Sequence, residues 1–203
     1  SYDGRQYHWS FDHDSTGFWL VNVDGSDVRR ILPYRLNTPA WSPDGKWISF
    51  SNGAQISIMP FDGENLDTAK TITFDFPGRN FFPTWNANGK KLTYNQSVCN
   101  EIPCGIWLYD IEKGSSELLS QYGMWSCWHP RDDSLIYLKN NLKDGKDIGD
   151  YVYLYDFSKK ASILLCTIES PNTNNRNLQY SPDGNFIAFI SILNNSEGSQ
   201  LFK

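Results

Sequence analysis

Three arginines recur in this sequence, each a few residues ahead of an aromatic side chain. Arg35 and Arg79 each lie six residues before a tryptophan, and Arg176 lies four residues before Tyr180. A guanidinium is a planar fork that donates paired hydrogen bonds to a carboxylate. Arginines gathered at one place would therefore bind the carboxylates of an acidic sugar or of a partner chain. Alternatively, each arginine pairs with a neighbouring Asp or bonds a loop carbonyl.

Two aromatic residues complete this candidate site. Tyr122 stands six residues before Trp128, in the place that Arg35 takes before Trp41. Trp125 is out of step with the recurring tryptophans, so we expect an exposed aromatic side chain near the same place. The predicted ligand-binding residues are Arg35, Arg79, Arg176, Tyr122 and Trp125.

The sequence contains no recognisable catalytic constellation. The three histidines, His8, His13 and His129, are scattered along the chain. Residues 12–14, Asp-His-Asp, are faintly similar to a calcium loop but lack its later acidic ligands. No nucleophile elbow, phosphate-binding loop or dinucleotide motif is present. We therefore predict no catalytic residue, no metal site and no cofactor.

One motif that would position these residues recurs along the whole chain. Trp41-Ser42-Pro43-Asp44-Gly45 precedes a short apolar strand, and related copies begin at Trp85, Trp128 and Tyr180, with a truncated copy at residues 1–9. The leading aromatics are 44, 43 and 52 residues apart, which suits four-stranded propeller blades. Pro, Asp and Gly favour a tight turn after each aromatic residue. We expect these aromatics to pack between blades.

Two further strands are expected after each motif copy. The third strand of each blade is predicted at residues 18–21, 56–58, 106–109, 152–155 and 201–202. The fourth is predicted at residues 28–32, 71–74, 117–119 and 163–165.

These residues carry a family resemblance. Pro-x-Trp-Ser-Pro-Asp-Gly-Lys, a short apolar strand, and then an Ile, Trp or Tyr strand ending in Asp-Gly resemble the WD40-like (PD40) repeat of TolB-type β-propellers. The resemblance covers essentially the whole chain and implies an all-β propeller of four-stranded antiparallel blades. It implies one domain, residues 1–203, with partial blades at 1–32 and 169–203 and full blades at 33–74, 75–120 and 121–168. Because such propellers usually have six blades, we expect a partial propeller; a closed four-bladed ring is the alternative.

The cysteines indicate in which cellular compartment the protein is located. Cys99 and Cys104 flank four residues of one loop, where a disulfide would add roughly 2 kcal/mol. Cys127 and Cys166 fall on different strands, so we expect them to be buried free thiols. A disulfide between Cys99 and Cys104 favours a periplasmic or secreted protein.

Composition narrows the partners. The chain has 203 residues, a net charge of −5 and no basic stripe, so nucleic acid is not an expected partner. No run approaches the roughly 18 apolar residues of a membrane span.

Three functions are compatible with these observations. The first is a non-catalytic module that binds a protein partner or an acidic glycan through the loop face and the channel mouth. The second is a propeller enzyme, such as an oligogalacturonate-lyase-like polysaccharide lyase, with catalytic residues outside this range. The third is a subunit that associates with copies of itself.

Overall fold

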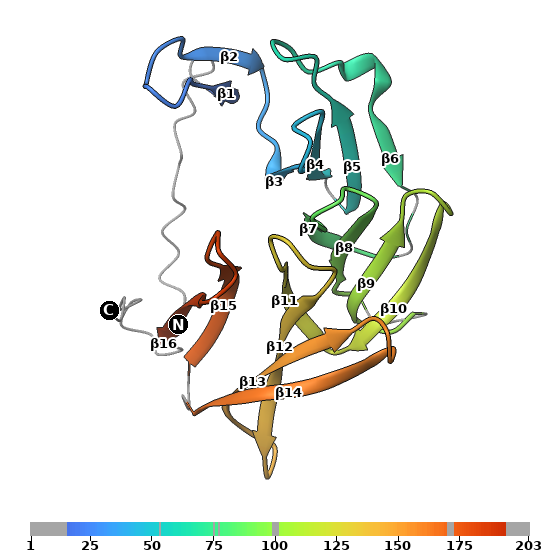
Figure 1. Cartoon of the computed structure of the whole chain (residues 1–203), viewed down its shortest axis with the longest axis vertical. Helices are drawn as coiled ribbons and strands as arrows, with labels where there is room; N and C mark the ends of the chain where they lie inside the picture. The colour runs from blue at the N-terminus through green and yellow to red at the C-terminus, as the bar shows by residue number, and fades with distance from the viewer. Residues whose placement is uncertain are drawn as a thin grey trace, which may run out of the picture.

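The structure consists of β-sheets arranged in order along an arc (Figure 1). The computed structural model describes residues 16–52, 54–74, 76, 78–98, 102–169 and 173–193. Within these residues the one helical element is a short 3-10 helix, η1 (Thr68–Lys70). No helix in this part of the chain is long and apolar enough to cross a membrane.

Three sheets have four antiparallel strands each, hydrogen-bonded in chain order. The first comprises β3 (Asn37–Trp41), β4 (Trp47–Asn52), β5 (Gln55–Pro60) and β6 (Ile72–Phe74). The second comprises β7 (Asn80–Trp85), β8 (Lys91–Gln96), β9 (Gly105–Asp110) and β10 (Ser115–Gln121). The third comprises β11 (Gly123–Trp128), β12 (Leu135–Lys143), β13 (Lys146–Asp156) and β14 (Ala161–Glu169).

Two-stranded sheets flank these three. They are β1 (Phe18–Leu20) with β2 (Arg29–Leu32), and β15 (Thr173–Tyr180) with β16 (Ile187–Leu193). The predicted all-β propeller of four-stranded antiparallel blades is therefore confirmed. Strands β3, β7, β11 and β15 lie on the inner side of the arc, as expected for first strands (Figure 1). The motif copy at residues 1–9, with His8, and the strand predicted at 201–202 lie outside the described residues.

The recurring turn forms because its side chains bond its own backbone. Ser42 Oγ donates to Asp44 Oδ1 at 2.6 Å and accepts from the N–H of Trp47 at 2.9 Å. Gly45, at φ 69°, donates its N–H to the Ser42 carbonyl at 2.9 Å. The bond from Ser42 lowers the pKa of Asp44, so the turn is strongest when this carboxyl is ionised.

The copy at Asn86 departs from the motif yet keeps its geometry. Asn86 Oδ1 accepts from the N–H of Lys91 at 2.8 Å, which is the role of Ser42 in the earlier copy. Asn88 Oδ1 accepts from the N–H of Lys90 at 2.9 Å, which is the role of Asp44. Amide oxygens thus replace the hydroxyl and the carboxylate without loss of the turn.

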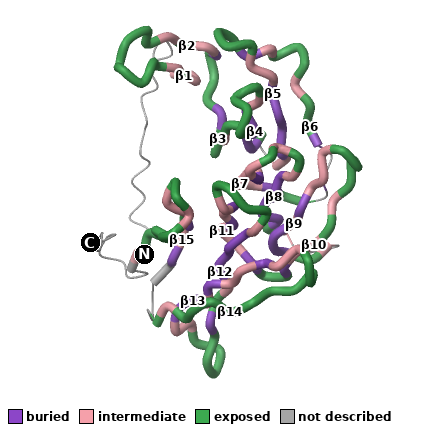
Figure 2. The backbone as a smooth tube through the Cα atoms, in the orientation of Figure 1, coloured by how far each residue is buried: buried purple, intermediate pink, exposed green. Residues whose placement is uncertain are grey.

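Successive sheets share their apolar cores. One buried cluster contains Ile58 of β5 and Tyr94 of β8, and the next contains Ile106 of β9 and Leu135 of β12. Figure 2 shows these middle strands as buried, whereas the outer strand β14 is almost wholly exposed. Burial raises the pKa of Tyr94 to about 12. Each sheet therefore depends on its neighbour for part of its core.

Two of the three tryptophans that end inner strands bond the preceding sheet; Trp41 is instead 45% exposed, and its ring packs against Phe61, which follows the third strand of its own sheet. Trp85 Nε1 donates to the Ala40 carbonyl at 3.3 Å. Trp128 Nε1 donates to Thr93 Oγ1 at 3.1 Å. Trp85 and Trp128 therefore pack between blades.

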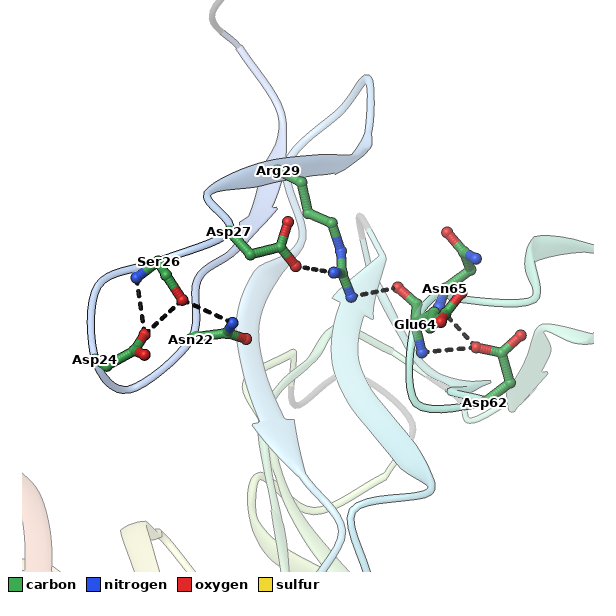
Figure 3. Close-up of polar contacts among 8 residues, drawn as sticks. All are labelled: Asn22, Asp24, Ser26, Asp27, Arg29, Asp62, Glu64 and Asn65. Carbon is green, nitrogen blue, oxygen red and sulfur yellow. Dashed lines mark hydrogen bonds and ion pairs between the residues drawn. The ribbon is translucent and has the colours of Figure 1, made fainter.

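Polar contacts attach both two-stranded sheets. Arg29 of β2 pairs with Asp27 and donates to the Glu64 carbonyl, 3.1 Å away in the loop after β5 (Figure 3). At the other end, Asn175 Nδ2 of β15 donates to Asp150 Oδ2 of β13 at 2.7 Å, and both side chains are buried. Burial raises the pKa of Asp150.

Candidate functional site

Each inner strand contains a β-bulge at the same place. The register shifts between Asn37 and Ala40, and at the matching positions of β7, β11 and β15. One residue of each bulge has a positive φ: Thr38 (48°), Phe82 (55°), Trp125 (56°) and Asn177 (55°). This conformation costs non-glycine residues roughly 1–2 kcal/mol, and bulges that re-aim side chains are common beside binding sites.

The four bulges line a central cavity of about 640 Å³. The lining comprises residues 38–40, 82–84, 125–127 and 176–179. Arg176 is the one Asp, Glu, Lys or Arg side chain among these lining residues. The cavity is therefore a place where the innermost strands of four successive sheets meet around one positive charge.

A second cavity, the junction cavity, has a volume of about 490 Å³ and adjoins the loop after β8 and the last residues of β12. Most of its lining residues are apolar: Phe81, Phe82, Cys104, Gly105, Tyr122, Gly123, Met124, Trp125 and Leu142. The polar ones are Asn95, Gln96, Ser97 and Asn140. The rings of Phe82 and Trp125 pack with centroids 4.3 Å apart. Because these two residues also line the central cavity, the two cavities share a wall.

One polar atom in the junction cavity lacks a partner. Asn95 is buried, and its Nδ2 donates to the Gly123 carbonyl at 3.2 Å. Its Oδ1 is also buried and accepts no hydrogen bond within the described part of the chain. A buried, unsatisfied acceptor costs roughly 1–3 kcal/mol. Such an atom at a cavity wall is therefore suited to a donor group on a ligand.

The structure brings together part of the predicted site. Tyr122 and Trp125 line the junction cavity, and Arg176 lines the central cavity beside it. Arg35 instead lines a third cavity of about 360 Å³. Arg79 is exposed ahead of β7, where its carbonyl accepts from the N–H of Ser97 at 2.9 Å.

Register explains this separation. Arg176 shares the slot four residues before the strand-end aromatic with Asn37, Phe81 and Met124. Arg35 and Arg79 lie two residues earlier in their copies, ahead of the inner strand. The sequence prediction missed Phe82 and Asn95. Phe82 could have been found by its position, because it stands three residues before Trp85, as Trp125 stands three residues before Trp128.

Of the three histidines, His129 lies in the described residues. In the described ranges, no group of three or more His, Cys, Asp or Glu side chains could hold a metal. His129 Nδ1 accepts from the N–H groups of Arg131 and Asp132, so this side chain shapes its turn. His8 and the Asp-His-Asp segment at 12–14 lie outside the described residues.

The cysteines differ in one respect from expectation. Cys104 is disulfide-bonded, while Cys127 and Cys166 are free. Cys99 lies outside the described residues, so its pairing stays a prediction. Cys127 is partly buried, and burial raises its pKa. Cys166 was expected to be buried but is exposed, because it lies on the outer strand β14.

Thiol titration tests the predicted bridge. Denatured without reductant, the protein is expected to give two reactive thiols, those of Cys127 and Cys166. After reduction the count should rise to the four cysteines of the sequence. Four thiols before reduction would contradict both the bridge and the expectation of an exported protein.

Comparison with known proteins supports the fold. No family model and no curated protein matches the sequence. Similar solved structures include TolB from Acinetobacter baumannii, with 20% identity and a TM-score of 0.66. This match covers 88% of the present chain and 43% of the TolB chain. An auxiliary nutrient binding protein from Bacteroides thetaiotaomicron has 15% identity and a TM-score of 0.56, over 82% of this chain and 40% of that one. An oligogalacturonate lyase in complex with manganese has 14% identity and a TM-score of 0.60, over 89% and 54%.

The chain thus has a TolB-like β-propeller fold and spans less than half the length of the TolB chain.

Proposed function

We propose that this chain is a non-catalytic binding module and that a glycan occupies its junction cavity. The buried Asn95 Oδ1 carries this proposal, because it is an acceptor without a donor, on a residue that lines a mainly apolar cavity. A sugar ring combines an apolar C–H face with hydroxyl donors. The C–H face can pack against the rings of Phe82 and Trp125, and a hydroxyl can donate a hydrogen bond to Asn95 Oδ1.

The surroundings of the cavity support a binding role. Amide side chains of Gln96 and Asn140 are also part of its wall, and amides both donate and accept. The strained φ values of Phe82 and Trp125 add support, because strain of this kind clusters at ligand sites. Among the similar structures, one is a nutrient binding protein and one is a lyase of a sugar chain.

A protein partner is the second candidate. Tyr122 and Leu142 are 60% and 62% exposed at the wall of the cavity, and exposed apolar side chains beside a cavity are typical of protein interfaces. The disulfide of Cys104 supports a periplasmic or secreted location of the protein, whichever of the two ligands it binds. A lyase activity would require catalytic residues beyond those described.

Calorimetric titration with neutral oligosaccharides tests the glycan proposal. Cellotriose, xylotriose and mannotriose are suitable probes. The variant Tyr122→Ala is expected to weaken binding about tenfold, because it removes one aromatic wall of the cavity.

The matched control is Tyr34→Ala. Tyr34 is 48% exposed and lines the cavity of Arg35 instead, so its loss should leave binding unchanged. Equal losses in both variants would refute the junction cavity as the site. Absence of binding to every sugar, with capture of a protein through the Tyr122 surface, would favour the second candidate.

A further inference from the structure

We infer that the ligand is an acidic glycan whose carboxylate binds Arg176 in the central cavity; this inference rests on the proposed glycan function. The observation behind it is independent of the junction cavity. Arg176 Nε is buried and has no hydrogen-bond partner within the described ranges. The residue as a whole is partly buried, and a buried donor without an acceptor costs roughly 1–3 kcal/mol.

The described residues that line the rest of the central cavity supply no carboxylate. Its lining contains no Asp or Glu, and no described carboxylate forms an ion pair with Arg176. Its hydroxyls are engaged elsewhere. Thr38 bonds Ser51 at 3.0 Å, and Thr84 bonds Thr93 at 2.9 Å. The guanidinium is therefore the charged group that an anionic ligand would meet among the residues lining this cavity, and the partly buried position strengthens its attraction for an anion.

The position of Arg176 is fixed by the sheet rather than by a loop. It pairs with Ile190 of β16, directly before the bulge at Asn177. The same slot in the other three inner strands holds Asn37, Phe81 and Met124, so the charge is particular to this blade. Because it is paired in the sheet, the backbone of Arg176 is already in place before a ligand binds, which lowers the cost of ordering the site.

The two cavities together define the ligand. Phe82 and Trp125 line both, so the cavities are adjacent, and the inference places a sugar ring in the junction cavity and a carboxylate of the same sugar chain in the central cavity. Asn95 Oδ1 requires a donor and Arg176 Nε requires an acceptor. Hydroxyls and a carboxylate occur together in uronic acid units, whereas a neutral glycan offers no anion to the arginine.

The test compares an acid with its ester. Calorimetry on the full chain would measure binding of trigalacturonic acid, its methyl ester and cellotriose at low and at physiological salt. The acid is expected to bind about tenfold tighter than the ester, and added salt should weaken binding of the acid more.

Variants locate the preference. Arg176→Gln is expected to abolish the preference for the acid while the ester still binds, and Arg176→Lys should keep part of it. Arg35→Gln is the control and should change nothing, since Arg35 lines another cavity. Thermal unfolding of each variant checks that it is folded.

The outcomes separate this inference from the proposed function. Equal binding of acid and ester, or an undiminished preference in Arg176→Gln, would overturn the inference and leave neutral glycan binding intact. If no sugar binds at all, the proposed function fails as well. If an acidic peptide such as tetraglutamate competes as well as the triuronic acid, the ligand class is wrong.

Discussion

Replacement of Leu135 by alanine is expected to lower the free energy of unfolding by about 2–5 kcal/mol. Leu135 is fully buried in β12, in a cluster that also contains Ile106 and Leu108 of the preceding sheet. Truncation loses apolar burial and leaves a cavity between two blades. Because sheets of a propeller are stabilised by contacts with their neighbours, the loss affects both blades.

Leu164→Ala provides the control for this prediction. Leu164 lies on the outer strand β14 and is 48% exposed, so its truncation should cost about 1 kcal/mol or less. Urea unfolding followed by tryptophan fluorescence measures both variants. If both variants lose the same free energy of unfolding, the buried cluster around Leu135 does not contribute to stability as expected.

Gly105→Ala is expected to be the most damaging single methyl addition, at about 4 kcal/mol or more. Gly105 has φ 141°, a conformation that L side chains rarely adopt. A Cβ there would lie 2.0 Å from the Ser120 carbonyl oxygen and 2.9 Å from the Tyr122 nitrogen. Both are backbone atoms, so the β9–β10 pair and the wall of the junction cavity would have to move.

Gly63→Ala separates backbone strain from collision. Gly63 also has a positive φ, 104°, but a Cβ there would meet no atom within 4 Å. This variant should therefore lose only about 1–2 kcal/mol. Denaturant unfolding of the pair is the measurement, and a comparable loss in both would show that the contact with Ser120 is unimportant.

Much of the fold could be predicted because its signals are local. Turn chemistry at Ser42, Asp44 and Gly45 depends on a few adjacent residues, and the strands follow from alternating apolar residues between such turns. The copy at Asn86 was recognisable for the same reason, because an amide oxygen makes the same bond.

The candidate site was predictable only in part, because the bulges are invisible to the motif. Thr38, Phe82, Trp125 and Asn177 share a backbone conformation but no side-chain property. None is glycine, the residue that normally signals a positive φ. Grouping the three arginines also overlooks that Arg176 stands four residues before its aromatic residue, whereas Arg35 and Arg79 stand six before theirs and precede the inner strand.

Burial on an outer strand was equally hard to judge. Cys166 lies in an apolar stretch, and apolar residues on a strand usually indicate a covered face. In β14 nearly all side chains are exposed, including Leu164 and Leu165. Their environment depends on what lies beyond the sheet, which the pattern along one strand does not contain.

The tryptophan bonds give the molecule a direction of assembly. Trp85 and Trp128 each donate to an acceptor in the sheet that precedes them in the chain, Ala40 and Thr93. Whether the chain emerges from a ribosome or from a translocation pore, its N-terminal part comes first, so the acceptor emerges before the donor that needs it. Each new sheet can then dock on one that has already emerged, and folding can proceed sheet by sheet from the N-terminal side.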